Sequence, residues 1–328
     1  AAFERANVLL KLSELLKANS EELAQLITRE TGKTISDSRV EMMRAVNATI
    51  ACSEEARQIT GEALDSDAYA AMGKKIGIVC WRPLGTIFCI TPFNFPINIA
   101  IHKIGPAYAA GNSVLFKPGP QNTATAQRLV ELCYEAGMPE NVLQFCMPEM
   151  KELDRLNGHS DVNAINFTGG TAAANAIAAA AGYKKLLLEL GGNDPLIVMD
   201  DADLEGAVKA AINQRFATAG QRCTAAKRLF VHETVYDAFR DLLVEKSSEL
   251  VVGDPAKDET FIGPLIHQGA ADQVRGFIED AIERGATVAM GNKYEGAFVY
   301  PTILENVDPE CELMVEEAFG PVMPLFKF

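Results

Sequence analysis

A regular alternation of short apolar segments and helical windows is the feature that most limits what this chain can fold into. Five segments of the first half are rich in β-branched and apolar residues: 76–81, 86–90, 113–116, 142–146 and 164–167. Helical patterns lie between them at residues 99–110 and 123–136. Strands and helices that alternate at this spacing predict right-handed crossovers and a parallel, doubly wound sheet. Such a sheet binds ligands at the carboxyl ends of its strands.

A second block with the same alternation begins near residue 190. It contains predicted strands at 196–199, 228–232 and 322–328, with helical patterns after Asp203 and at 235–251. At roughly 150 residues per domain, the 328 residues suffice for about two domains. We therefore expect one domain over residues 1–190 and a second over residues 191–328, with no low-complexity linker between them.

The first fifty residues follow a helical period instead. Leu9, Leu12 and Leu16 share one helical face, Ser20 is placed to cap a second helix, and Gly32 is placed to end it. We therefore expect two antiparallel helices in this region.

Charge and cysteine content narrow the functional classes. The sequence carries 30 Lys and Arg against 44 Asp and Glu, and this net charge of −14 disfavours nucleic acid and anionic membranes as partners. Seven cysteines, an odd number without a CxxC pair, indicate reduced thiols and a cytoplasmic location. No apolar run approaches the ~18 residues that a membrane span needs.

Cys223 is the strongest candidate for a catalytic nucleophile. The sequence has no GxSxG or HExxH motif and its four histidines are scattered singly, so we expect neither a serine hydrolase nor a metal site. Cys223 lies in the segment AGQRCT, directly after Arg222. A neighbouring cation favours the thiolate, which is the reactive form of cysteine.

Two further residues suit the same chemistry. Glu189 ends an apolar strand before two glycines, where we expect it to be buried and to serve as a general base. Asn94 lies between Pro92 and Pro96, so its amide is a rigidly held donor for an oxyanion. A cysteine, a carboxylate and a fixed amide together indicate acyl chemistry through a thioester.

At these residues the sequence resembles the aldehyde dehydrogenase superfamily over essentially its whole length. Six motifs occur in the order of the family: TPFNFPIN around Asn94, LFKP at Lys117, NFTGGT at Gly169, LELGG at Glu189, GQRC at Cys223 and EEAFGPV around Glu317. The resemblance implies an α/β protein of the aldehyde dehydrogenase fold, with a Rossmann-like parallel-sheet cofactor domain and an α/β catalytic domain.

The resemblance also bears on the assembly. Relatives extend further at both ends, so it implies a chain truncated at both ends, with an incomplete catalytic domain. Residues 62–83 would be part of a subunit-contact hairpin, and the full-length protein would be a homodimer or homotetramer.

The resemblance assigns a role to each catalytic candidate. Cys223 would attack the carbonyl carbon of an aldehyde, and the Asn94 side chain and the Cys223 backbone amide would hold the oxyanion. Hydride would leave for a nicotinamide, and Glu189 would activate the water that hydrolyses the thioester to a carboxylic acid.

The cofactor implied by the resemblance is NAD or NADP. Lys117 would bind the adenosine ribose, Gly169 and Gly170 would border the pyrophosphate, and Glu317 with Phe319 would contact the nicotinamide side. The sequence departs from the family in this region, because Gly170 stands where Ser is usual and Ala174 where Gly is usual. Pro120 stands where many NAD-preferring relatives carry Glu, which leaves the choice between NAD and NADP open.

Arg222 points to a substrate class. An arginine directly before the nucleophile resembles members that oxidise small anionic aldehydes such as glyceraldehyde 3-phosphate or phosphonoacetaldehyde, because a guanidinium binds phosphate, sulfonate or carboxylate. Arg44 is a second candidate contact. A structural loop arginine at position 222 and a solvated helix face at position 44 are the alternatives.

Two other functions stay open at this point. A coenzyme A-acylating aldehyde dehydrogenase is one, although such relatives commonly lack a glutamate at the position of Glu189. A catalytically silent subunit that retains the fold is the other, although Cys223, Glu189 and Asn94 are all present.

Overall fold

The computed structural model describes residues 1–65, 73 and 75–328. The chain forms two compact units, residues 1–20 with 41–189 and residues 21–40 with 190–328. Residues 21–40 thus pack in the second unit, whereas a division at residue 190 alone places them in the first. Within the described ranges, none of the helices combines the length and the apolar character that a membrane crossing needs.

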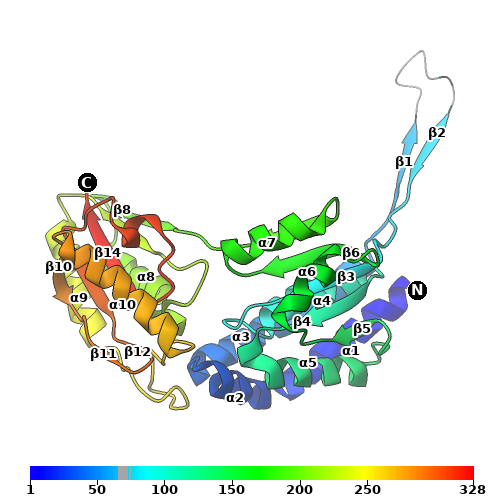
Figure 1. The fold of residues 1–328 in the computed structure, drawn as a ribbon, viewed down its shortest axis with the longest axis horizontal. Coiled ribbons are helices and arrows are strands. Elements are labelled where there is room, and N and C mark those ends of the chain that lie inside the picture. Colours follow the sequence, from blue (N-terminus) through cyan, green and yellow to red (C-terminus); the bar gives the residue numbers. More distant parts are fainter. Residues whose placement is uncertain (66–72, 74) are drawn as a thin grey trace. The chain divides into compact units, whose positions relative to one another are not determined.

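The first unit is built on a parallel sheet with the strand order β5-β4-β3-β6-β7 (Figure 1). Its strands are β3 (Thr86–Ile90), β4 (Ser113–Lys117), β5 (Leu143–Phe145), β6 (Val162–Thr168) and β7 (Lys185–Glu189). The first strand of this sheet in the sequence, β3, lies in the middle. The next two, β4 and β5, lie on one side of it, and β6 and β7 lie on the other. The order therefore reverses between β3 and β6, as in dinucleotide-binding sheets. This arrangement confirms the predicted parallel, doubly wound sheet for four of the five predicted segments. Segment 76–81 lies outside the sheet, because its strand β2 (Ile76–Val79) pairs antiparallel with β1 (Glu62–Asp65), and β7 is the fifth strand instead.

The crossovers of this sheet are helical, as the sequence predicts. They are α4 (Asn98–Ala109), the 3-10 helix η1 (Pro120–Asn122), α5 (Thr123–Ala136), α6 (Met150–Gly158) and α7 (Thr171–Ala181). The helices α4 and α5 pack with α1, whereas α6 packs with α7. Apolar side chains fill the central strand almost continuously, since Ile87, Phe88, Cys89 and Ile90 are all buried.

Three helices occupy residues 1–56, namely the two expected before Gly32 and a third that carries Arg44. They are α1 (Ala2–Ala18), α2 (Ser20–Thr31) and α3 (Ile35–Ala56). The Ser20 hydroxyl donates to the carbonyls of Leu16 and Lys17 at 2.8 and 2.9 Å, so it closes α1 and does not cap α2 as expected. Gly32 follows α2 with a φ of +73°, which confirms the predicted helix end.

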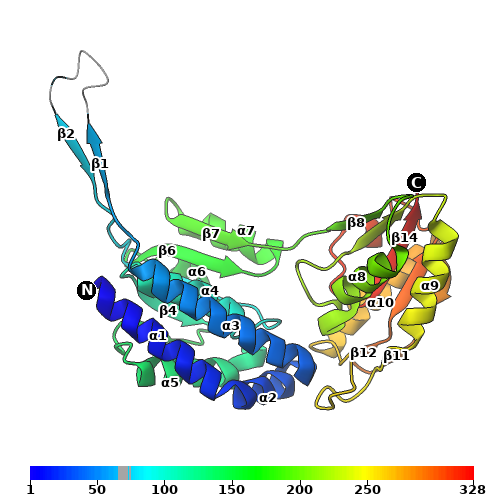
Figure 2. The same ribbon diagram turned by 180° about the vertical axis from the view of Figure 1, so that it is seen from behind.

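Strands β1 (Glu62–Asp65) and β2 (Ile76–Val79) form an antiparallel hairpin that projects away from the sheet of the first unit (Figures 1 and 2). Part of the expected segment 62–83, residues 66–72 and 74, lies outside the described residues. Ile76 and Ile78 are 80% and 74% exposed and alternate along β2, so they share one face of the hairpin.

The second unit contains a mixed sheet with the order β10-β13-β14-β9-β8. Its strands are β8 (Pro195–Val198), β9 (Arg228–Val231), β10 (Thr287–Met290), β13 (Thr302–Glu305) and β14 (Val322–Lys327), and β11 (Tyr294–Glu295) pairs with β12 (Phe298–Val299). Its helices besides α2 are α8 (Leu204–Phe216), η2 (Ala217–Gly220), α9 (Tyr236–Ser248), α10 (Gln268–Glu283) and α11 (Glu312–Val315). Side chains such as Phe216, Phe239 and Ile278 form its core.

Candidate active site

The carboxyl edge of the first unit's sheet collects most of the residues that the sequence singles out there. Lys117 ends β4, Asn94 follows β3, Gly169 follows β6 and Glu189 ends β7. Backbone bonds join these ends, since Thr91 N–H donates to the Lys117 carbonyl at 3.0 Å and Gly169 N–H to the Glu189 carbonyl at 3.1 Å. The residues therefore lie where a doubly wound sheet binds its ligand.

Asn94 is buried in the turn between β3 and α4. The turn leads into a fixed helix start, because Glu41 Oε1 accepts the backbone N–H groups of Ile97 and Asn98 at 2.9 and 3.0 Å. A buried amide on such a turn suits an oxyanion donor that needs little reorganisation.

The Lys117 ammonium is partly buried at the end of its strand. Its Nζ donates to the Pro118 carbonyl at 3.3 Å. Burial lowers the pKa of Lys117, and burial raises the pKa of the nearby Cys146 thiol to about 11. The lysine thus retains donors for a polar ligand at this edge of the sheet.

The N-terminus of α7 fits a dinucleotide phosphate. Gly170 is the N-cap residue of α7, where backbone N–H groups point out of the helix and favour an anion. A Cβ added at Gly170 meets no atom within 4 Å, so space above this helix end is open. A Cβ at Gly169 lies 2.5 Å from Cζ of Phe167, so this glycine permits a close approach of the backbone to the ring.

Glu189 differs from the expectation in one respect. Its side chain is exposed and not buried. The reason is that β7 is an edge strand of its sheet, paired only with β6 among the described residues. Exposure gives the carboxylate access to water, which a general base for hydrolysis requires.

Lys103 is a residue near Glu189 that the sequence analysis missed. It lies on α4 and is buried, and its Nζ donates to Asn166 Oδ1 of β6 at 2.6 Å. Burial lowers the pKa of Lys103 to about 8, partly opposed by Cys89 and Glu189. A lysine inside a mostly apolar helix was the available signal. A group with this pKa exchanges protons near neutral pH.

In the second unit, Cys223 lies in an irregular loop that begins with a strained backbone. Thr218 and Ala219 have φ values of +56° and +52°, and Gly220 has +73°. The left-handed region costs a non-glycine residue about 1 kcal/mol or more. Cys223 is partly buried three residues further on.

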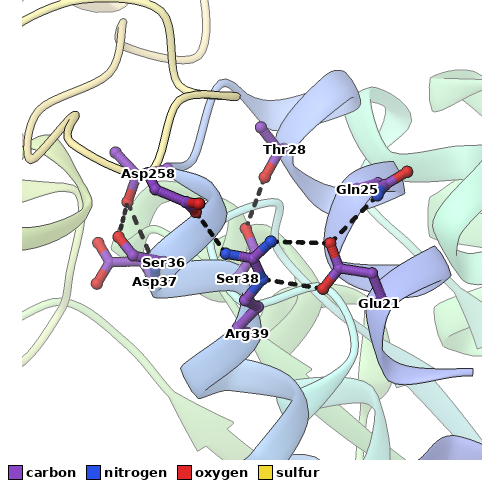
Figure 3. Close-up of polar contacts among 9 residues, drawn as sticks. Glu21, Gln25, Thr28, Ser36, Asp37, Ser38, Arg39 and Asp258 are labelled. Carbon is purple, nitrogen blue, oxygen red and sulfur yellow. Dashed lines mark hydrogen bonds and ion pairs between the residues drawn. The ribbon is translucent and has the colours of Figure 1, made fainter. Parts of the chain in front are cut away.

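Asp37 stabilises this backbone from the first turn of α3. Its Oδ2 accepts the Thr218 N–H at 2.8 Å and the Thr218 hydroxyl at 3.1 Å. Figure 3 shows the same helix end, where Arg39 bridges Glu21 and Asp258 and the Ser38 hydroxyl contacts Thr28. The start of α3 therefore anchors the nucleophile loop, a role that the sequence analysis did not assign.

The segment around Glu317 and Phe319 connects α11 to β14 and is tied to the same loop. Arg215 at the end of α8 is fully buried and donates to the carbonyls of Val322 and Ala318, the latter at 3.0 Å. A Cβ added at Gly220 lies 2.3 Å from the Gly320 carbonyl oxygen, so only glycine permits this contact. The structure thus brings the GQRC and EEAFGPV motifs together.

The two candidate substrate arginines lie in different units. Arg222 is partly buried, and its Nη1 donates to the Asn213 carbonyl at 3.4 Å. Arg44 is exposed on α3, and both Arg44 and Glu189 act electrostatically on His102. Asn94, Lys117, Gly169, Gly170, Glu189 and Arg44 belong to the first unit, and Arg222, Cys223, Glu317 and Phe319 belong to the second.

Metal ligands do not gather at either set of residues. Over residues 1–65, 73 and 75–328, no three His, Cys, Asp or Glu side chains are grouped so that they could hold a metal ion.

Comparison with known proteins gives the same family as the motifs. A sequence profile described as "Aldehyde dehydrogenase family" matches residues 1–328. A sulfoacetaldehyde dehydrogenase from Neptuniibacter caesariensis is 80% identical over 328 residues, which are 100% of this chain and 72% of that protein. A 3-sulfolactaldehyde dehydrogenase from Priestia aryabhattai is 39% identical over 327 residues, 99% of this chain and 69% of that protein.

Solved structures agree with this result. The NADP-dependent glyceraldehyde-3-phosphate dehydrogenase from Bacillus halodurans C-125, complexed with NADP, superimposes with a TM-score of 0.96 at 36% identity, covering 100% of this chain and 69% of that one. These findings confirm the predicted fold and the resemblance from which the nicotinamide cofactor was predicted. The chain therefore belongs to the aldehyde dehydrogenase family and is an NAD(P)-dependent aldehyde dehydrogenase.

Proposed function

We propose that the protein oxidises sulfoacetaldehyde, or an equally small anionic aldehyde, to its carboxylic acid. The observation that carries this proposal is the 80% identity, over the whole chain, to a protein named sulfoacetaldehyde dehydrogenase. Arg222 directly before Cys223 supports it, because a guanidinium matches the charge and geometry of a sulfonate.

In this proposal the Cys223 thiolate attacks the aldehyde carbonyl carbon, and a C–S bond forms as the carbonyl oxygen becomes an oxyanion. The buried Asn94 amide and the Cys223 backbone N–H donate hydrogen bonds to that oxyanion. Bound NAD or NADP supplies the acceptor for the hydride that leaves the former aldehyde carbon. The carbon is then held as a thioester on Cys223.

The second half of the reaction belongs to Glu189 in this proposal. Its exposed carboxylate takes a proton from water, which attacks the thioester carbon, and the C–S bond breaks to release the acid and the Cys223 thiolate. Lys103 interacts electrostatically with Glu189.

The cofactor residues divide between the units. We infer that residues 1–190 act mainly as the cofactor-binding domain and residues 191–328 as the catalytic domain, with Glu317 and Phe319 contacting the nicotinamide side. The open space at Gly170 and the Lys117 donors support the adenosine and pyrophosphate assignments.

Rapid mixing with detection of the reduced nicotinamide tests the proposal. We expect a burst of about one equivalent per chain with sulfoacetaldehyde, and no burst from Cys223→Ala. Steady turnover should not require coenzyme A. A strict requirement for coenzyme A would favour the acylating alternative, and a folded protein without any burst would favour the catalytically silent subunit.

Arg222 can be tested separately. Arg222→Met should lower kcat/KM for sulfoacetaldehyde about tenfold or more, since a hydrogen bond to a charged group contributes ~1.5–3 kcal/mol. The same variant should leave kcat/KM for propionaldehyde, an uncharged aldehyde of similar size, within about threefold. Equal losses for both aldehydes would indicate a purely structural arginine, and Arg44→Met provides the parallel test for the second candidate.

We also infer a homodimer or homotetramer in the cytoplasm. Exposed Ile76 and Ile78 on one face of the hairpin support a subunit contact. The seven cysteines are unbridged, and Cys80 is exposed, which suits a reducing compartment.

A further inference from the structure

Lys227 is a buried lysine that contacts both functional motifs of the second unit. It lies four residues after Cys223, directly before β9, and is 1% exposed. Its Nζ donates to the carbonyl oxygen of Cys223 and forms an ion pair with Glu317 Oε1 at 3.3 Å. Asp194 Oδ2 lies 3.5 Å from the same nitrogen. The Ala225 carbonyl oxygen also lies 3.5 Å from this nitrogen. An ammonium has three donors, and the shorter contacts are those to Cys223 and Glu317.

Gly191 leaves room for the other side of the Glu317 carboxylate. A Cβ added at Gly191 lies 1.9 Å from Glu317 Oε2, so any other residue would displace this oxygen. The carboxylate therefore lies close to the Gly191 backbone on one side and is paired with the Lys227 ammonium on the other. Removing the charge of Lys227 would release the carboxylate on one side, because a buried charge needs its partner.

We propose that Lys227 is a positioning residue that couples the nucleophile Cys223 to the cofactor-side carboxylate of Glu317. The inference rests on the proposed function, in which Cys223 attacks the aldehyde and Glu317 contacts the cofactor. The hydrogen bond to the Cys223 carbonyl fixes the peptide that carries the thiol. The ion pair fixes Glu317, so one side chain sets the position of both.

The two contacts can be separated by the choice of substitution. Lys227→Met removes both the donor and the charge at nearly equal volume. Lys227→Gln retains a neutral donor for the Cys223 carbonyl and loses the ion pair with Glu317, and Lys227→Arg retains both functions. Lys209→Met, which removes an exposed lysine of α8, is the matched control.

Two measurements that need no aldehyde report on the contacts of Lys227 with the Cys223 carbonyl and with Glu317. The first is the rate of Cys223 alkylation by iodoacetamide against pH, measured on the Cys223 peptide by mass spectrometry. The second is the dissociation constant of NAD and of NADP, measured by calorimetry. For Lys227→Met we expect the alkylation rate of Cys223 and the cofactor affinity each to fall about tenfold. For Lys227→Gln we expect only the cofactor affinity to fall. Lys227→Arg and Lys209→Met should give values near those of the wild type.

A double-mutant cycle with Glu317→Gln decides whether Lys227 acts on the cofactor through Glu317. If it does, the double variant Lys227→Met/Glu317→Gln binds cofactor no more weakly than Glu317→Gln alone. Independent losses that multiply would overturn the proposal, as would a folded Lys227→Met with unchanged alkylation and affinity. If circular dichroism shows that Lys227→Met does not fold, the cycle with Lys227→Gln applies the same criterion.

The outcomes distinguish this inference from the proposed function. A wild-type protein that gives no aldehyde-dependent burst contradicts the proposed function. The alkylation and affinity measurements still decide on Lys227 in that case, since neither uses the aldehyde.

Discussion

Gly169 and Gly170 are adjacent glycines with different steric requirements. A side chain at Gly169 would collide with Phe167, whereas Gly170 has open space and a φ of −72° that any residue adopts. The family usually has Ser at the position of Gly170. The absence of a serine hydroxyl here is therefore not enforced by packing.

Gly170→Ser should consequently strengthen cofactor binding. Ser is a good N-cap residue and adds a hydroxyl donor beside the pyrophosphate, so we expect an affinity gain of about three- to tenfold by calorimetry. Gly169→Ala is the matched control, and we expect it to weaken binding and lower the melting temperature. A Gly170→Ser variant with unchanged or weaker affinity would contradict the assignment of this helix end to the pyrophosphate.

Lys103 gives the free energy of unfolding a pH dependence. Its pKa is about 8 in the folded protein against a reference value of 10.5, so between these values the unfolded chain binds more protons than the folded one. Stability from this group is therefore fully present above pH 10.5 and is lost as pH falls through about 8. The full difference corresponds to ~3 kcal/mol at ~1.4 kcal/mol per pH unit.

Urea unfolding at several pH values from 7.5 to 10 tests this behaviour. The free energy of unfolding of the wild type, minus that of Lys103→Met, should rise with pH across this window. The subtraction removes groups common to both proteins. A difference that stays flat would mean that Lys103 titrates normally in the folded protein.

At the scale of the elements, the start of α3 contacts both a group of charged surface residues and the loop that carries Cys223. Arg39 pairs with Glu21 through two contacts of 2.9 Å and also with Asp258, and the hydrogen bonds from Arg39 and Gln25 lower the pKa of Glu21 to about 2. Asp37, on the same helix, binds Thr218. The helix start is thus fixed on one side by charges and holds the strained loop on the other.

Asp37→Ala should loosen the nucleophile loop. Loss of two hydrogen bonds to a carboxylate should lower the free energy of unfolding by about 2–3 kcal/mol and slow Cys223 alkylation several-fold. Ala219→Gly removes a left-handed non-glycine residue, so it should raise the stability of the wild type by about 1 kcal/mol. Chemical denaturation measures both, and unchanged alkylation in Asp37→Ala would exclude the anchoring role.

The elements also show what local sequence can and cannot predict. Strand β3 and helix α5 match their predicted ranges because their apolar patterns and Gly137 act within a few residues. The sequence likewise predicted that Glu189 ends a strand, and it is the last residue of β7. The role of Asp37 was not predicted, because its partner Thr218 is 181 residues away in the sequence. Glu189 was predicted to be buried, but β7 lies at the edge of the sheet, and local sequence does not determine the order of strands in a sheet.

At the scale of the whole molecule, the site residues are distributed over two units that the chain enters more than once. Residues 21–40 pack in the second unit although the chain on either side of them belongs to the first. The start of α3 can therefore support Cys223 from a position early in the sequence. A division of the chain by sequence position alone does not predict that residues 21–40 pack in the second unit. The sequences of α2 and α3 have the pattern of ordinary amphipathic helices, which does not indicate the unit against which they pack.

The hairpin of β1 and β2 yields the prediction on assembly. Ile76 and Ile78 lie on one face and are largely exposed, and an isolated two-stranded hairpin is marginally stable in water without a partner. We expect the wild type to be oligomeric and the variant Ile76→Lys/Ile78→Lys to be monomeric, because paired lysines on this face would have to be desolvated in a subunit contact.

Size-exclusion chromatography with light scattering measures this outcome directly. Met150→Lys is the matched control, since Met150 is 79% exposed in the same unit but lies outside the hairpin, and this variant should keep the wild-type mass. The double lysine variant should retain cofactor binding, because the hairpin lies outside the carboxyl edge of the sheet. An unchanged oligomer in the double variant, or a monomeric wild type, would remove the hairpin as the subunit contact.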